Sequence, residues 1–457
     1  MFILIFFRIP FVDPVFYQAY KESSELKLSI FEYDYEDTYL EILKTPKKTF
    51  DTIIKIELDG ELADKFEPDE LHKRIKRINI LSKFQNLVEL DFGNLHLDYY
   101  DNKDYDYERD GTDEDEDEDL ISNIRDFLGL IPKKIVSVGG LGIEVRWSYA
   151  TAAEFISHFK ALKSIENISF SIHNSNYNMD PENVESFTSA LSKQTNLTHL
   201  DISFIHNIQY STGDNLSFFP PETFSVFKQL TNLTNLNLYL TEIDFQNYRI
   251  KSMKDDIVFL KDLKPLTKLV VHFGSSGIAN KFWYMKKDND VPVVETIVEN
   301  LKQLIFLQFT NDIPMSSRGS IPGPAVSFKG LEQFYSLMEL TLKYMNVKGS
   351  DLNIISKIPN LKSFILEEMV DMNNDLKATD FNPFKSSTIQ MFTIYYKEST
   401  VDQLKINRLD LIDILLTIPK IELLNIWTGG VKDEKWLEDF EKRANLATRK
   451  GINLIYY

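Results

Sequence analysis

A short apolar pattern recurs along most of the chain and restricts its fold more than any other feature of the sequence. Each copy consists of an apolar residue, two variable residues, a second apolar residue, one variable residue and a third apolar residue. Eleven copies start at Ile53, Leu87, Ile165, Leu197, Leu233, Leu266, Leu304, Leu337, Leu361, Ile389 and Ile421. A degenerate copy near Ile135 and Val138 follows the second, so that successive copies lie about 33 residues apart on average. Such a period predicts a stack of similar units that bury their apolar faces against one another.

The segments between the copies are expected to form helices. Asp180-Pro181 supplies an N-cap and a first-turn proline, and Val184, Phe187 and Leu191 then share one helical face. The same spacing occurs at Phe328, Leu331, Phe334 and Leu337. Each unit is therefore predicted to be a short strand, a loop, and a helix that returns to the next strand.

These units resemble the leucine-rich repeat family. The segments Thr195–Ile202 and Thr231–Leu238 (TNLTHLDI and TNLTNLNL) are the best matches to its motif. The resemblance implies an α/β solenoid of about twelve irregular strand–loop–helix units, with a curved parallel sheet on its concave face. The long units are similar to those of the ribonuclease-inhibitor subclass. The sequence departs from the family pattern because Leu95, His173 and Ile205 stand where an Asn or Cys closes the strand turn.

The resemblance divides the chain into residues 1–50, which lack the pattern, and a solenoid over residues 51–457. Residues 1–50 can be an N-terminal cap, a degenerate F-box that would dock a ubiquitin-ligase adaptor, or a targeting segment. Ile9-Pro10 stands where an F-box has Leu-Pro, and the apolar start at residues 1–7 has no basic residue before it. At the other end, residues 432–450 predict an amphipathic helix with Trp436, Leu437 and Phe440 inward, followed by a last edge strand.

Composition and charge exclude several classes of protein. The chain has no cysteine, which excludes disulfides, thiolate metal sites and a cysteine nucleophile. The net charge of −18 argues against a nucleic-acid partner, and residues 98–119, an acidic loop insertion, carry 13 acidic and 2 basic residues. No apolar run reaches the roughly 18 residues of a membrane span. We therefore expect a cytoplasmic protein, with secretion left open by residues 1–7.

The sequence contains none of the common catalytic motifs. It has no phosphate-binding Gly-Lys-Ser/Thr loop, no Gly-x-Ser-x-Gly elbow and no zinc-binding histidine spacing. We therefore expect no enzyme activity and no cofactor. A weak calcium candidate lies in the acidic insertion, where the side chains spaced as in an EF-hand loop are Asp106, Glu108, Asp110 and Asp117. A solvated acidic loop explains the same residues without any metal.

A protein partner is the remaining expectation, and it would bind through the concave face. The variable strand positions should line that face, including Asp201 and Thr310 and, as candidate contacts, Tyr239, Phe306, Tyr395 and Trp427. Aromatic side chains are enriched at protein interfaces. The loop 281–287 (KFWYMKK) holds two further candidates, Trp283 and Tyr284. This loop is expected either to cover the concave face near Phe306 or to contact the partner itself.

Overall fold

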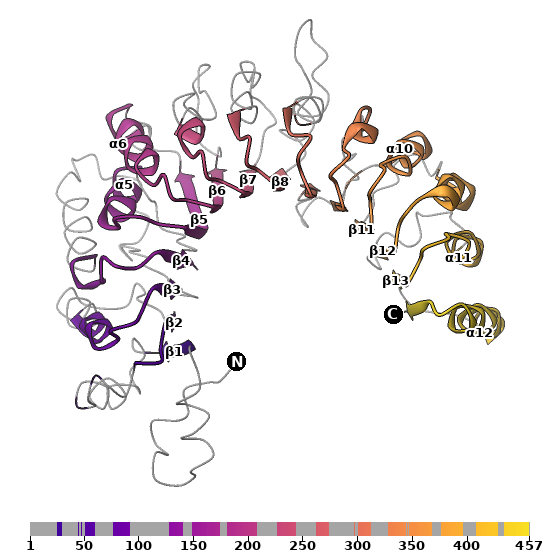
Figure 1. Cartoon of the computed structure of the whole chain (residues 1–457), viewed down its shortest axis with the longest axis horizontal. Helices are drawn as coiled ribbons and strands as arrows, with labels where there is room; N and C mark the ends of the chain where they lie inside the picture. Colours follow the sequence, from indigo (N-terminus) through magenta and orange to yellow (C-terminus); the bar gives the residue numbers. More distant parts are fainter. Residues whose placement is uncertain are drawn as a thin grey trace, which may run out of the picture. The chain divides into compact units, whose positions relative to one another are not determined.

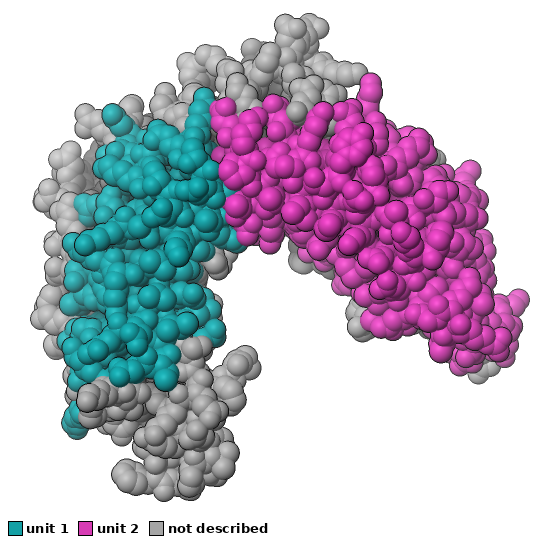
Figure 2. Space-filling model, in the orientation of Figure 1, with its two compact units in different colours: residues 1–207, 225–233 teal, residues 208–224, 234–457 magenta. Residues whose placement is uncertain are grey.

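The computed structural model describes residues 25–29, 44, 47, 51–59, 76–91, 128–139, 149–173, 181–207, 226–243, 262–273, 297, 300–311, 328–343, 345, 347–367, 376–395, 408–427 and 434–456. They fall into two compact units (Figure 2). Unit 1 comprises residues 1–207 and 225–233, and unit 2 comprises residues 208–224 and 234–457. Each unit builds its own stack of parallel strands.

In unit 1 the described strands pair in chain order, and each pair is parallel. They are β1 (Glu25–Ser29), β2 (Lys55–Asp59), β3 (Glu89–Asp91), β4 (Ser137–Gly139), β5 (Ser164–His173) and β6 (His199–Asn207). The helical elements are η4 (Lys76–Lys83), α5 (Tyr149–His158), α6 (Pro181–Ser192) and η6 (Val226–Gln229). The helix expected after Asp180-Pro181 is confirmed as α6, with Phe187 and Leu191 buried.

Unit 2 repeats this arrangement. Its strands are β7 (Asn235–Ile243), β8 (Lys268–Phe273), β9 (Phe306–Asn311), β10 (Glu339–Lys343), β11 (Ser363–Glu367), β12 (Met391–Tyr395), β13 (Leu423–Trp427) and β14 (Asn453–Tyr456). All are parallel to their neighbours within the unit. The helical elements η8 (Leu331–Gln333), α10 (Gly349–Ile355), η9 (Ala378–Ser386), α11 (Arg408–Leu415) and α12 (Glu434–Arg449) lie on one side of the strands (Figure 1).

The buried residues confirm the repeat pattern. Every pattern position whose side chain the structure describes is buried, and Leu304, Leu307 and Phe309 are all at 0% exposure. The degenerate copy is also part of this core, because Ile135 and Val138 are buried beside β4. The described residues thus form a leucine-rich repeat solenoid. We call the face of each sheet that is turned away from the helices its concave face.

The structure has one strand more than the sequence predicts, and one helical element is shorter than predicted. The strand β1 pairs with β2 in register, so the sheet includes a strand before the first copy of the pattern. Apart from residues 25–29, 44 and 47, residues 1–50 lie outside the described residues, so the cap, the degenerate F-box and the targeting segment stay predictions. The apolar spacing at 328–337 produces only the short 3-10 turn η8 rather than an α-helix. A spacing of three residues fits both an α-helix and a 3-10 helix. Phe328 and Phe334 are buried on either side of the short 3-10 turn.

Asparagine side chains tie successive turns together. The residue before the first leucine of a copy donates its Nδ2 proton to a carbonyl oxygen of the preceding turn in three cases. These are Asn86 to Asp51 (2.6 Å), Asn232 to Thr195 (2.8 Å) and Asn360 to Tyr335 (2.6 Å). These bonds satisfy turn carbonyls that no helix or strand would satisfy.

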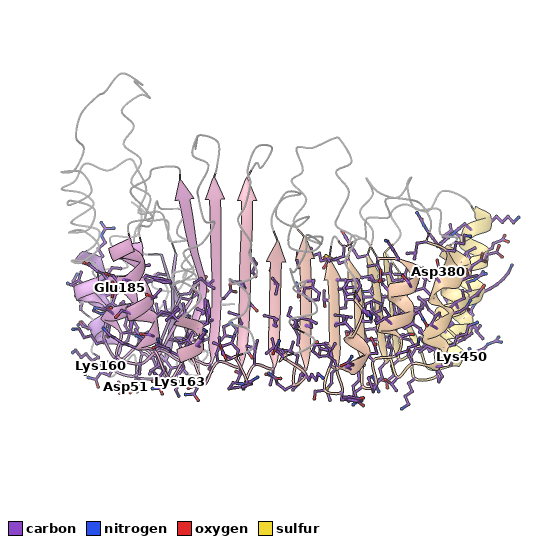
Figure 3. The ribbon with its side chains drawn as sticks, turned by 90° about the horizontal axis from the view of Figure 1, so that it is seen from above. Asp51, Lys160, Lys163, Glu185, Asp380 and Lys450 are labelled. Atoms are coloured by element: carbon purple, nitrogen blue, oxygen red, sulfur yellow. The ribbon has the colours of Figure 1, made fainter. Side chains whose placement is uncertain are left out.

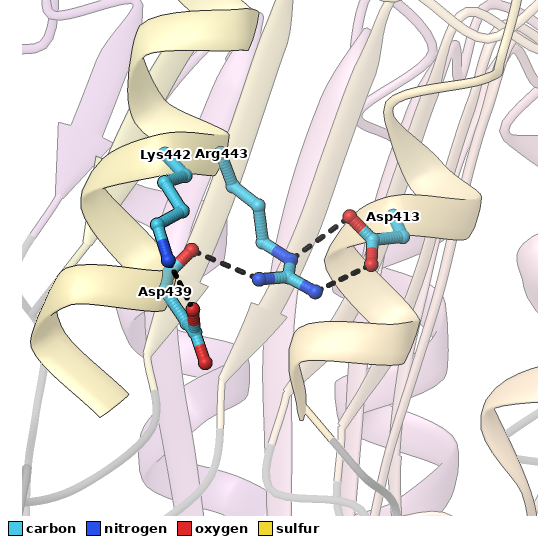
Figure 4. Close-up of polar contacts among 4 residues, drawn as sticks. All are labelled: Asp413, Asp439, Lys442 and Arg443. Carbon is cyan, nitrogen blue, oxygen red and sulfur yellow. Dashed lines mark hydrogen bonds and ion pairs between the residues drawn. The ribbon is translucent and has the colours of Figure 1, made fainter. Parts of the chain in front are cut away.

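The C-terminal helix α12 is anchored by an ion pair (Figure 4). Arg443 donates from Nε and Nη2 to the two carboxylate oxygens of Asp413 on α11, at 2.8 and 2.6 Å. The helix ends before Gly451. The φ angle of this residue is 72°, in the left-handed region where glycine is favoured, and β14 follows as predicted. Leu437, which the sequence placed inward, is 45% exposed instead. The buried residue on this helix is Ala447, one helical turn after Arg443.

Candidate partner-binding surface

The parallel register of unit 2 places the variable strand residues in rows across its concave face. The first row is Asn235, Lys268, Phe306, Glu339, Ser363, Met391 and Leu423. The second row is Asn237, Val270, Gln308, Thr341, Ile365, Thr393 and Asn425. The third row is Tyr239, His272, Thr310, Lys343, Glu367, Tyr395 and Trp427. Core and concave positions alternate because successive side chains of a strand point to opposite faces.

The third row is held by contacts between neighbouring strands. The rings of Tyr239 and His272 stack with their centroids 3.9 Å apart and their planes at 17°. Further along, Lys343 donates to Glu367 at 3.0 Å, with about a third of each side chain exposed. These contacts fix side chains from β7, β8, β10 and β11 in one row, which reduces the conformational entropy lost when a partner binds.

The environment of His272 favours its neutral form. Burial and, to a smaller degree, the positive charge of Lys343 lower the pKa of His272 from 6.5 to about 4. The ring is therefore uncharged at neutral pH, which suits a face-to-face stack on Tyr239. A charged ring there would lose hydration and would be repelled by Lys343.

We expect acid to destabilise the fold through His272. Between pH 6.5 and 4 the unfolded chain binds a proton at this ring and the folded chain does not, so the free energy of unfolding falls as the pH falls. The loss between pH 7 and pH 5 should be about 2 kcal/mol. Urea unfolding of the wild type and of His272→Phe at both pH values measures it. The variant keeps an aromatic ring against Tyr239 and should lack this part of the pH dependence; equal pH dependence in the two proteins would contradict the prediction.

Phe306 is partly covered by a cation. The Nζ atom of Lys268 lies 5.1 Å from the centre of the Phe306 ring, and the Phe306 side chain is half-buried. A cation over an aromatic face gains electrostatic attraction while the ring edge stays accessible. Phe306 can therefore contact a partner, but it is less exposed than an isolated surface aromatic residue.

An apolar patch lies on β11, β12 and β13. It consists of Ile365, Met391, Tyr395 and Leu423, which come from all three rows and are all half-buried. Register pairs Ile365 with Thr393 and Met391 with Leu423, so the four side chains belong to adjacent strands. The apolar patch has a polar margin, because Glu339 and Lys343 lie on the neighbouring strand β10 and Glu367 ends β11 in register with Tyr395.

The concave face of unit 1 has a different character. Its half-buried side chains on β2 and β3 are Lys55, Glu57, Glu89 and Asp91, three of them acidic. The Asp91 carboxylate lies close to the backbone of β4, because a Cβ at Gly139 would come within 3.4 Å of it. Among the described residues, no group of three His, Asp or Glu side chains could hold a metal ion.

The structure describes some of the predicted site residues and leaves others outside the described ranges. Tyr239, Phe306 and Tyr395 lie on the concave face of unit 2. Trp427 ends β13 in register with Tyr395, although its side chain is not described. The aromatic residues Trp283 and Tyr284, and the calcium candidates Asp106, Glu108, Asp110 and Asp117, lie outside the described residues.

Two residues predicted for the concave face are buried, and several concave residues were missed. Asp201 and Thr310 are only 7% and 1% exposed, so neither offers a contact surface. The missed residues are His272, Lys343 and Ile365. The copies of the pattern that start at Leu266, Leu337 and Leu361 would have identified them, because His272 and Lys343 directly follow the last apolar residue of a copy and Ile365 is a variable position of one.

Comparisons with known proteins add little to this description. No protein-family model matches the chain, and no curated protein matches it. Among solved structures, the crystal structure of a TLR13–ssRNA13 complex aligns with 12% sequence identity and a TM-score of 0.35, over 91% of this chain and 57% of that one. The chain therefore spans less than two thirds of that protein's length. A likeness this weak carries no argument about a ligand, and the fold assignment rests on the paired strands and the buried repeat positions.

Proposed function

We propose that the protein is a non-catalytic scaffold that binds another protein through the concave face of unit 2. The observation that carries this proposal is the apolar patch of Ile365, Met391, Tyr395 and Leu423, half-buried on three adjacent strands. Met and aromatic residues are enriched in protein interfaces, where they supply contact area in the desolvated centre.

The surroundings of the apolar patch also suit a protein partner. Thr393 and Asn425 lie within it, and charged residues occupy only its margin. A mainly apolar centre with a polar margin is the usual arrangement of a protein interface. Among the described helices none combines the length and apolar character needed to cross a membrane.

Two finer assignments belong to this proposal. We place Trp283, Tyr284 and Trp427 among the residues that contact the partner, on the basis of their residue types. We also assign the repeats to the ribonuclease-inhibitor-like subclass, which is supported by the α-helices α5, α6, α10 and α11 between strands. The 3-10 elements η8 and η9 occupy the same position in two other units.

Affinity capture with a double variant tests the proposed surface. Met391→Ser and Tyr395→Ser together remove most of the apolar patch without touching a core position. Proteins captured by the tagged wild type are quantified by mass spectrometry, and the Kd of the main one is then measured with purified components. We expect the double variant to weaken this binding by about thirtyfold or more, since even one interface anchor contributes roughly 2 kcal/mol.

The matched control removes exposed apolar surface elsewhere. Leu437 and Leu446 on α12 are 45% and 42% exposed, and Leu437→Ser with Leu446→Ser should leave the Kd unchanged. The proposal fails if the two double variants bind the partner equally well, or if the recovered partner is bound only through other surfaces while both variants remain folded.

A further inference from the structure

Exposed lysines gather at one edge of each unit, although the chain as a whole is acidic. We call this the turn edge, because it consists of the turns that lead from the helical elements into the strands. In unit 2 its exposed lysines are Lys264, Lys302, Lys357, Lys362, Lys385 (in the last turn of η9), Lys420 and Lys450. The exposed acidic residues at the same edge are Asp262, Glu339 and Glu422. Unit 1 repeats the pattern, and Figure 3 shows Lys160 and Lys163 at its turn edge and Lys450 at that of unit 2.

A structural role explains only part of this enrichment. Cations are favourable near helix C-termini, where carbonyl groups lack partners. Lys450 acts in this way, because its Nζ donates to the Leu416 carbonyl at 3.0 Å, and Lys134 donates to carbonyls of Phe84 and Gln85 in unit 1. The side chains of four others make no hydrogen bond or ion pair with any residue that the structure describes, namely Lys357, Lys362, Lys385 and Lys420.

The turn edge of unit 2 also exposes apolar side chains among the lysines. Tyr335 is 68% exposed, Ile305 43% and Met338 39%. They are neighbours, because the Met338 amide donates to the Ile305 carbonyl at 2.9 Å and the Asn360 side chain donates to the Tyr335 carbonyl. The Lys362 amide in turn donates to the Met338 carbonyl at 2.8 Å. Apolar and cationic groups thus share one continuous strip.

We propose that the turn edge of unit 2 binds the surface of an anionic phospholipid bilayer. Lysines near such a surface are attracted by its negative potential, and each contributes to binding independently of any fixed geometry. Tyr335 suits the headgroup layer, since tyrosine has an apolar ring and a polar tip. Ile305 and Met338 can enter the boundary between headgroups and acyl chains, as apolar residues of peripheral proteins do.

The same residues suit a nucleic acid less well. Arginine is the preferred residue for phosphate recognition, and the described turns before β8 to β13 contain none. Single-strand binding depends on base stacking, and of the three exposed apolar side chains only Tyr335 offers a ring, since Ile305 and Met338 are aliphatic.

Vesicle cosedimentation with the full chain tests the proposal. The probes are vesicles of phosphatidylcholine alone and vesicles with 30% phosphatidylserine. We expect binding only to the second kind, and we expect it to weaken as salt rises from 0.1 to 0.5 M. A variant with Lys357, Lys362, Lys385 and Lys420 all changed to Gln should bind at least about tenfold more weakly. Tyr335→Ser with Met338→Ser should weaken binding severalfold at unchanged net charge.

A charge-matched variant supplies the control. This control changes four other exposed lysines to Gln, namely Lys329, Lys348, Lys377 and Lys435. It alters the net charge by the same amount at positions away from these turns, and it should leave vesicle binding nearly unchanged. Circular dichroism melts verify that all variants fold. The proposal is overturned if the wild type does not prefer anionic vesicles, or if both lysine variants lose vesicle binding equally. It is also overturned if the turn-edge lysines are required for binding single-stranded RNA while the Tyr335 and Met338 changes leave vesicle binding intact.

Discussion

Replacing Phe392 by alanine should lower the free energy of unfolding by about 3–5 kcal/mol, the largest effect expected of any substitution considered for this protein. Phe392 is a core position of β12 at 0% exposure. Its ring meets those of Phe364 on β11 and Phe384 in η9 edge to face, at centroid distances of 5.2 and 5.3 Å, and Phe381 lies 6.1 Å away. Alanine would leave a cavity between two strands and the helical element that covers them.

Chemical denaturation of Phe392→Ala and two companion variants measures this effect. Phe392→Leu keeps most of the volume, so it should cost less than half as much as alanine. Thr393→Ala changes the next residue, which faces the concave side, and should alter stability by about 0.5 kcal/mol or less. A loss below about 1 kcal/mol for Phe392→Ala would show that the four phenylalanine rings do not form a packed cluster.

The repeat pattern predicts the sheet well because a strand alternates sides with a fixed period of two residues. Once Leu307 and Phe309 are assigned to the core, Phe306 and Gln308 must face the other way, and the structure confirms this alternation. Even the degenerate copy predicts a strand, because Ile135 and Val138 keep the spacing of the first two apolar positions.

Other features depend on contacts between distant repeats, which a local pattern does not contain. Gln194 is only 2% exposed, yet nothing in its neighbourhood marks it as a core residue. Its side chain accepts from the Leu162 amide and donates to the carbonyls of Ile156 and Phe159, so it joins the end of α6 to the end of α5. A buried polar group of this kind is stable only when its partners are in place.

The candidate site also combines features that the local pattern predicts with features that depend on contacts between repeats. Alternation predicts which residues face the concave side, but exposure depends on the sizes of the neighbours on adjacent strands. Thr310 is short and lies in register between His272 and Lys343, so longer side chains flank it on both sides and it is buried. The apolar patch arises because half-buried apolar residues occupy variable positions on three successive strands, a coincidence that becomes visible only when the rows are aligned.

Replacing Leu236 by alanine should lower the free energy of unfolding by about 2–5 kcal/mol. Leu236 is at 0% exposure in β7, in register with Leu269 of β8, and Leu233 beside it in the repeat is also buried. Because neighbouring repeats stabilise one another, hydrogen exchange should accelerate most in β7 and β8 and least in β13. Leu437→Ala, at a 45% exposed position, is the control and should change stability by about 0.5 kcal/mol or less. Equal losses of unfolding free energy in the two variants would contradict the core assignment. Uniform acceleration of hydrogen exchange through β13 would contradict nearest-neighbour coupling, since the cavity would then have weakened repeats that it does not touch.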